Sequence, residues 1–133
     1  MDTININTKA RFDIIDITSQ IQSCITKSNV KSGIAVIFIP HTTAGVSINE
    51  NADPDVAYDL KDIFNNMIPE HDHYRHSEGN SQAHALSTLT SPSLTVIIEN
   101  GKIVLGIWQN IYFMEYDGPR NRKAHIQIIN KGE

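Results

Sequence analysis

The chain has 133 residues and a net charge of −4, with 40% hydrophobic and 20% charged residues. This length suits one domain with a sizeable core, and the composition is typical of an ordinary globular protein. The acidic balance, without a dense Lys/Arg block, gives no electrostatic footprint for nucleic acid, and no apolar run is long enough to span a bilayer. We therefore predict a single domain over residues 1–133, a cytoplasmic location, no nucleic-acid partner and no membrane partner.

The first third of the chain predicts strands around one short helix. Residues 3–7 alternate polar and apolar, as a half-buried strand does, and residues 11–16 continue in extended character. Thr18 or Ser19 is predicted to cap a short helix, because apolar residues follow at helical spacing. Residues 34–39 form a continuous β-branched run, which is typical of a strand buried on both faces.

The next segment places a histidine beside a strand end and then starts a helix. Pro40 ends the β-branched run, so His41 is expected in a loop on a rigid support. Residues 46–49 alternate like a short strand, and Asp53-Pro54 predicts a helix N-cap followed by the first helical residue. We expect this helix to end near residue 69. Its predicted buried stripe is Val56, Leu60, Ile63, Phe64 and Met67.

The second half of the chain is predicted to be β-rich. The pattern indicates a polar loop at 70–80, a short helix at 81–90, and strands at 94–98, 103–116 and 124–129. Asn100-Gly101 is a strong two-residue hairpin signal. The predicted fold class is therefore α+β, mostly strands, with two or three helices.

Three histidines in polar, glycine-bearing segments carry the clearest chemical signal: His41, His76 and His84. Imidazole is the commonest neutral metal ligand and titrates near pH 7. Each histidine alone is more often solvated or hydrogen-bonded, and the spacing matches no standard zinc pattern. If the two segments meet in the fold, however, the three side chains supply the ligands of an open metal site.

An acid-and-amide run follows His41 and ends at the predicted helix start. Asp53 caps the helix, and in the simplest interpretation Asn51 forms an Asx turn while Asn49 and Glu50 face solvent. Glu50 has no evident structural task, which makes it the best candidate for a general acid or base. The helix N-terminus beyond it can also bind anions through its backbone N–H groups.

Two turns add candidate ligand-binding groups. Gly79 permits a backbone turn that brings neighbours such as Asn80 inward. Residues 117–122 are by default a tight turn, but Arg120 and Arg122 can grip a phosphate or carboxylate bidentately.

Taken in order, these motifs resemble the YjbQ-like family, known as secondary thiamine-phosphate synthases. HTTAGVSINENADPD, EGN followed by His84, and GIWQNIYFMEYDGPR carry the resemblance, which extends from about Phe12 to Ile129. It implies a mixed two-sheet β-sandwich with two or three packed helices, assembled as a homotrimer with sites near subunit interfaces. It also implies a pocket with a bound divalent metal, for which three histidines suit zinc better than magnesium.

The leading functional hypothesis is a metal-dependent enzyme that joins a thiazole phosphate to a hydroxymethylpyrimidine diphosphate and releases diphosphate. The predicted metal ligands are His41, His76 and His84; the catalytic residues are Glu50, Asp53 and Asn49; the substrate-binding residues are Thr42, Asn51, Asn80 and Arg120. One alternative is a metal-dependent hydrolase of a small phosphorylated or ester substrate. Another is a trimeric metal-binding or small-molecule-binding protein without turnover.

Overall fold

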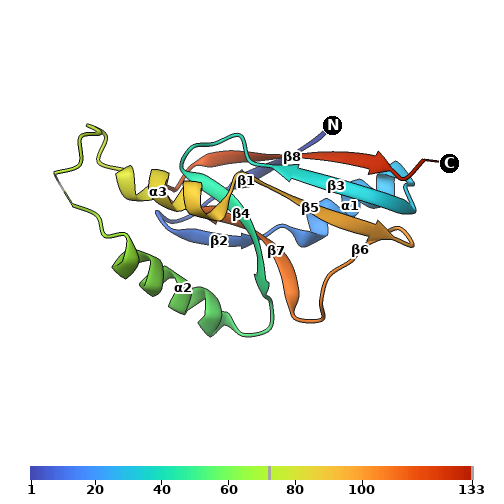
Figure 1. The fold of residues 1–133 in the computed structure, drawn as a ribbon, viewed down its shortest axis with the longest axis horizontal. Helices are drawn as coiled ribbons and strands as arrows, with labels where there is room; N and C mark the ends of the chain where they lie inside the picture. The colour runs from blue at the N-terminus through green and yellow to red at the C-terminus, as the bar shows by residue number, and fades with distance from the viewer. Residues whose placement is uncertain (72, 133) are drawn as a thin grey trace.

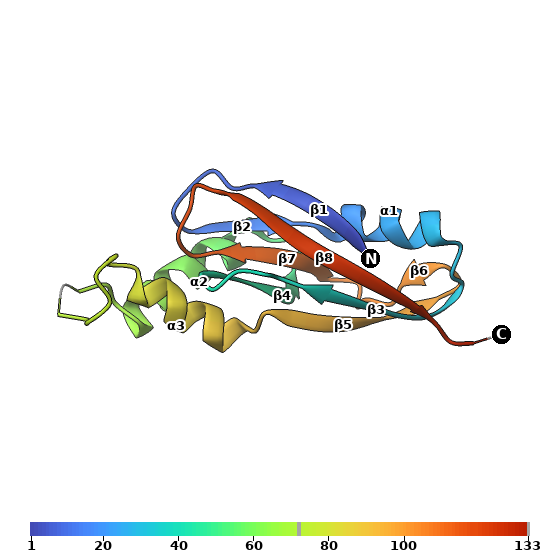
Figure 2. The ribbon, with the colours of Figure 1, turned by 90° about the horizontal axis from the view of Figure 1, so that it is seen from above.

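Two antiparallel sheets stack face to face in the computed structural model, which describes residues 1–71 and 73–132 (Figures 1 and 2). The larger sheet has the order β1 (Asp2–Asn7), β8 (Asn121–Asn130), β3 (Ser32–Phe38), β5 (Ser93–Glu99) and β6 (Lys102–Ile103). The smaller sheet has the order β2 (Asp13–Asp16), β7 (Gln109–Glu115) and β4 (Ala44–Glu50). The helices are α1 (Thr18–Ser28), α2 (Pro54–Met67) and α3 (Ser81–Thr90).

The α+β class and the two-sheet arrangement are confirmed, with one difference. We expected mixed sheets, but every strand pairing in the described residues is antiparallel. The hairpin at Asn100-Gly101 is confirmed, since both residues have positive φ, 52° and 75°, as a two-residue turn of this type requires.

The main core lies between the sheets and is built from alternate residues of the strands, which point to the same face. Ala35 and Ile37 of β3 face Ile111 and Phe113 of β7, and all four are fully buried. Helix α1 closes one side of this core with buried isoleucines, including Ile21. Burying one such side chain contributes roughly 1.5–3 kcal/mol.

The other face of the larger sheet is apolar and exposed. The β-branched run 34–39 was predicted to be buried on both faces, but Ile34 and Phe38 point outward and are 36% and 45% exposed. Ile34 pairs with Ile97 of β5 on one side and with Ile129 of β8 on the other, and both partners are exposed as well. Three adjacent strands thus present one row of isoleucines to solvent.

A second, smaller core covers the far side of the smaller sheet. Phe12 and Tyr116 meet edge to face at 5.3 Å there, and Leu86 of α3 packs against them. Helix α3 lies close on β4, because a Cβ on Gly45 would stand only 2.5 Å from Oγ1 of Thr90. This close approach to Gly45 fixes the position of α3 against β4.

Helix α2 begins as predicted but packs less than expected. The Asp53 carboxylate accepts a hydrogen bond from the Asp55 N–H at 2.9 Å, and Pro54 is the first helical residue. The predicted stripe is confirmed only in part, because none of its residues is fully buried: Val56, Leu60 and Phe64 are half-buried, whereas Ile63 and Met67 are 47% and 63% exposed. In Figure 1, α2 lies below the sheets and follows the end of β4 through a short loop.

Two other boundaries differ from the sequence prediction. Helix α1 begins at Thr18, but the capping group is the carboxylate of Asp16, which accepts from the Thr18 N–H at 3.0 Å. The predicted strand 103–116 is interrupted, because the Gln109 side chain accepts the Gly106 N–H and closes a turn. Trp108 in this turn is 59% exposed.

Within the described residues, no helix has both the length and the apolar character needed to cross a membrane.

Candidate functional site

The two halves of the predicted site lie at opposite ends of β4. His41 precedes the strand and Glu50 ends it, and the seven residues of extended chain between Ala44 and Glu50 span about 20 Å. Within one chain, therefore, the histidines and the acid-and-amide run line different cavities. We call them the histidine pocket and the α2 cavity.

The histidine pocket has a volume of about 340 Å³ and brings together three distant segments. Its lining comprises His41, Thr42 and Thr43 before β4, His76, Glu78, Asn80 and His84 around the start of α3, and Arg120 and Arg122 before and in β8. The rings of His76 and His84 meet edge to face, with centroids 5.1 Å apart. The predicted convergence of the three histidines on one cavity is thus what the fold shows.

His41 is held by the backbone of the larger sheet. Its Nε2 accepts a hydrogen bond from the Lys123 N–H at 2.9 Å, so a neutral ring carries its proton on Nδ1. Partial burial, and secondarily the positive charge of Arg122, hold the pKa of His41 below its usual value. Near neutral pH, His41 is therefore an uncharged imidazole with one N–H to donate.

Arg122 of the pocket lining belongs to a buried ion pair. Glu115 of β7 and Arg122 of β8 are 0% and 5% exposed, and they join the two sheets by two hydrogen bonds. Burial alone would raise the pKa of Glu115, but hydrogen bonds from Arg122, the Asp117 N–H and Thr8 hold it below its usual value. The Arg122 guanidinium also donates to Oγ1 of Thr43 at 2.8 Å, which fixes the chain beside His41.

Arg120 lies at the mouth of the pocket. Its guanidinium donates to the carboxylate and the carbonyl of Asp117, both at 2.8 Å, and its side chain is 51% exposed. The same carboxylate accepts from Nδ2 of Asn80 at 2.8 Å. The Asn80 Oδ1 atom is buried and has no hydrogen-bond partner within the described chain, so it is an acceptor available to a ligand.

The three histidines do not fit a metal site as they stand. No group of three or more His, Cys, Asp or Glu side chains is arranged to hold a metal ion, as far as the structure describes the chain. In addition, Nε2 of His41 accepts the Lys123 N–H, and in a neutral ring the other nitrogen carries the proton. A zinc ion bound by all three histidines would require His41 to release this bond.

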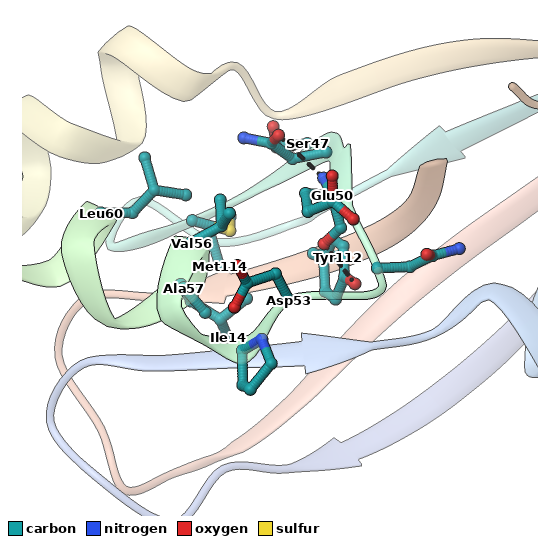
Figure 3. A pocket seen from close by; sticks show the side chains of 12 residues that line it. Ile14, Ser47, Glu50, Asp53, Val56, Ala57, Leu60, Tyr112 and Met114 are labelled. Carbon is teal, nitrogen blue, oxygen red and sulfur yellow. Dashed lines mark hydrogen bonds between the residues drawn. The ribbon is translucent and has the colours of Figure 1, made fainter. Parts of the chain in front are cut away.

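The α2 cavity lies between the start of α2 and the smaller sheet and has a volume of about 190 Å³ (Figure 3). Ile14, Val56, Ala57, Leu60, Tyr112 and Met114 form its apolar wall, and Ser47, Asn49, Glu50, Asn51 and Asp53 its polar part. Glu50 accepts from the Ala52 N–H at 2.9 Å, and its carbonyl accepts from the Tyr112 hydroxyl at 2.9 Å. Burial, and then the charges of Asp16 and Glu50, raise the pKa of Tyr112.

The acid-and-amide run has structural tasks, but apart from the Asp53 cap they differ from those of the simpler interpretation, because no Asx turn at Asn51 is among the described hydrogen bonds. Asn51 donates from Nδ2 to Oδ1 of Asn110 at 3.2 Å, and the Asn49 side chain accepts the Glu50 N–H at 2.8 Å. These bonds form a tight turn between β4 and α2. The predicted catalytic role of Glu50, Asp53 and Asn49 requires them to lie beside the histidines. Within one chain they do not, because β4 separates the two groups.

Sequence reasoning missed Glu115 and the structural role of Arg122. Arg122, expected in a turn where it can bind a ligand, is instead buried and paired. One signal was present: Glu115 is a charged residue at an inward-facing position of the apolar strand IYFMEY. A buried strand carboxylate requires a partner, and the nearest arginines in the chain are those of the following turn.

Known proteins of one family match this chain over nearly its whole length. A family model described as UPF0047 protein YjbQ-like matches residues 2–131. A UPF0047 protein of Methanocaldococcus jannaschii is 51% identical over 93% of this chain and 90% of its own length. The YugU protein of Bacillus subtilis is 46% identical over 97% of this chain and 98% of its own length.

Solved structures of similar sequence have the same fold. A crystal structure of a YjbQ/UPF0047-family protein from Clostridium acetobutylicum has a TM-score of 0.95 at 46% identity, covering 97% of this chain and 100% of that one. A YjbQ-like protein of unknown function from Sulfolobus solfataricus has a TM-score of 0.93 at 31% identity, covering 98% and 96%.

Proposed function

The chain belongs to the UPF0047 YjbQ-like family, and we propose that it is an enzyme acting on a small phosphorylated molecule in the histidine pocket. The observation that carries this proposal is the composition of the pocket wall. Three imidazoles and two guanidinium groups line one cavity, and Glu78 is the only carboxylate among its described lining residues. Arginine and histidine donors of this kind recognise phosphate oxygens.

Each group has a role that follows from its contacts. The Nδ1–H of His41 and the outer N–H groups of Arg120 donate to phosphate oxygens, because their other donors and acceptors are already used. The Asn80 Oδ1 acceptor takes a hydroxyl or amino hydrogen of the ligand. His76 and His84 line the same pocket as His41, with their rings in contact, and are the candidates to move a proton to or from the leaving group.

Within this class, the specific reaction we propose is thiamine-phosphate synthesis. The nitrogen of the thiazole phosphate forms a bond to the methylene carbon of the pyrimidine diphosphate, whose C–O bond breaks and releases diphosphate. The charge that develops on the departing diphosphate is stabilised by the donors of the pocket. Catalysis by Glu50 or Asp53 would need the α2 end of another subunit to reach this pocket.

The test combines the two substrates with the purified chain and measures thiamine phosphate by chromatography. We expect turnover that falls at least ~100-fold in His84→Ala, while His71→Ala, which removes a histidine outside the pocket, keeps it. No product, in an assay where a known synthase gives product, rejects this reaction. Stoichiometric phosphate binding without any turnover would favour the non-catalytic binding protein.

A hydrolase of phosphate esters is the second candidate, and one observation favours it. His76 and Glu78 are exposed, so water reaches the pocket, whereas a transferase benefits from excluding water. A panel of phosphate and carboxylic esters separates the two reactions, because hydrolysis needs no second substrate. Release of inorganic phosphate from one substrate alone identifies the hydrolase.

A zinc ion held by His41, His76 and His84 remains a proposal beside these reactions. Elemental analysis of the purified chain, with His41→Ala and His84→Ala beside it, tests it directly. Near-stoichiometric zinc that is lost in both variants supports a three-histidine site. Zinc retained in His41→Ala shows that His41 is not a ligand, in agreement with its hydrogen bond to the Lys123 N–H in the unmodified chain.

We also propose assembly as a homotrimer. The supporting observation is the exposed row Ile97, Ile34 and Ile129 on the outer face of the larger sheet, which a neighbouring subunit would cover. Light scattering at micromolar concentration gives the mass: three times 14.9 kDa supports the trimer, and 14.9 kDa rejects it. Ile34→Lys places a charge in the middle of the row and is expected to yield monomers.

A further inference from the structure

The α2 cavity has a chemistry opposite to that of the histidine pocket. No lysine, arginine or histidine is among its described lining residues, whereas Glu50 and Asp53 both contribute carboxylates. Neither carboxylate forms an ion pair with a basic side chain in the described chain. The cavity therefore has negative charge at one end that is not neutralised by the protein.

Apart from the uncharged polar residues Ser47, Asn49 and Asn51, the rest of the wall is mainly apolar. Ile14 and Met114 of the smaller sheet face Val56 and Ala57 of α2 across the cavity, with Asp53 and Glu50 at the end where α2 begins (Figure 3). An apolar cavity with a few polar groups at one end is the usual form of a site for a small amphiphilic molecule.

The helix N-terminus does not make this an anion site. The N–H groups that an anion would need are already used, because Asp53 accepts from the Asp55 N–H and Glu50 from the Ala52 N–H, both at 2.9 Å. One oxygen of each carboxylate thus accepts a hydrogen bond from the backbone. The second oxygen of each, Oδ2 of Asp53 and Oε1 of Glu50, makes no hydrogen bond in the described structure and can accept from a ligand.

The volume limits the apolar body of the ligand. The cavity measures about 190 Å³, and an apolar cavity of roughly 150 Å³ holds one benzene molecule. One six-membered ring or a chain of similar volume therefore fits, with a short polar group reaching the carboxylates.

From these four observations we propose that the α2 cavity binds a small organic ammonium ion. The apolar body lies between α2 and the smaller sheet, and the ammonium group donates to Glu50 and Asp53. This site is separate from the phosphate site at the other end of β4 and does not depend on the reaction proposed there. Charge-assisted hydrogen bonds to two carboxylates give the preference for a cation.

Three probes of equal size and different charge test the proposal on the full chain: benzylammonium, benzyl alcohol and benzoate. Binding is followed by ¹H–¹⁵N NMR, with titration of the amides of Val56, Ala57 and Tyr112. We expect benzylammonium to bind at least ~10-fold more tightly than benzyl alcohol, because each charge-assisted bond contributes a factor of this order. Benzoate should not shift these amides.

Matched variants separate charge from shape. Glu50→Gln and Asp53→Asn keep the backbone hydrogen bonds of the turn and the helix cap. Each should weaken benzylammonium by roughly 10-fold and leave benzyl alcohol unchanged. Ala57→Leu fills the cavity and should abolish binding of both probes. The proposal is overturned if the alcohol binds as tightly as the amine, if Glu50→Gln and Asp53→Asn both bind the amine normally, or if no probe shifts these amides at millimolar concentration.

Discussion

The two ends of β4 carry cavities that are built on opposite principles. At the start of the strand, charged groups are paired inside the protein, and the pair Glu115–Arg122 fixes the pocket wall by joining both sheets. At the end of the strand, the carboxylates have no cationic partner in the described chain, and the roof is a helix without a buried residue. The comparison shows that internal charge pairing fixes the wall at the start of β4, whereas the carboxylates at its end have no internal counter-ion and lie under a lightly packed helix.

Breaking the pair inside the histidine pocket should have the largest effect. Glu115→Gln leaves the Arg122 charge buried without a counter-ion, and loss of one partner of a buried pair costs about 3–5 kcal/mol. Urea unfolding measures this loss. Glu78→Gln removes an exposed carboxylate from the same pocket and should change the free energy of unfolding by less than ~0.5 kcal/mol. Equal, small effects would show that the wall is not held by the pair.

Loosening the roof of the other cavity should cost less. Phe64 of α2 is half-buried and stacks on Phe12 at 6.2 Å, so Phe64→Ala should lose about 1–3 kcal/mol, below the usual cost for a fully buried phenylalanine. Met67→Ala, on the exposed face, should lose less than ~0.5 kcal/mol.

Hydrogen exchange should show the same contrast without any mutation. Amides of α2 are expected to open at a lower free energy than those of β7 and β8, because the helix buries little apolar surface. Equal protection of α2 and β8 would contradict the description of α2 as the weakly held roof.

Much of the fold could be predicted because local chemistry decides it. The Asp53-Pro54 helix start and the Asn100-Gly101 hairpin each depend on neighbouring residues alone, and both are confirmed. The outward position of Ile34 and Phe38 could not be predicted, because a β-branched run reads the same whether a second layer or a further subunit covers it.

The candidate site divides in the same way. His41, His76 and His84 converge as expected, although that convergence depends on where α3 packs. The expected meeting with Glu50 and Asp53 fails within one chain, because a strand holds its two ends apart by its full length. The Glu115–Arg122 pair depends on contact between the two sheets, which no local pattern specifies.

The pH dependence of stability should separate the contributions of His41 and of the Glu115–Arg122 pair on the acid side. The pKa of His41 is lowered in the folded state from its usual 6.5, so the unfolded chain takes up this proton first and stability falls as pH drops below about 6.5. Glu115 acts at lower pH. Because its pKa is lowered in the folded state, it contributes stability above pH 4.5, its usual pKa, and this stability is lost as pH falls through the folded-state pKa. His41→Gln should remove the first decline, and the variant His71→Ala should keep it.

A small effect on stability is expected at the mouth of the histidine pocket. Arg120→Ala removes an exposed ion pair with Asp117, which contributes at most ~1 kcal/mol. Phosphate affinity, measured by calorimetry, should nevertheless fall by roughly 10-fold, because a charged donor to the ligand is lost. A large stability loss with unchanged phosphate affinity would make Arg120 a structural residue instead.

The turn between β6 and β7 gives the protein a built-in optical reporter. Trp108 is the only tryptophan of the chain, and its indole is more than half exposed. Its fluorescence emission should therefore be that of an indole in water, and unfolding should change it little. Subunit contact over this turn would shift the emission to shorter wavelength, so a dilution series of the unmodified protein can separate assembly from folding.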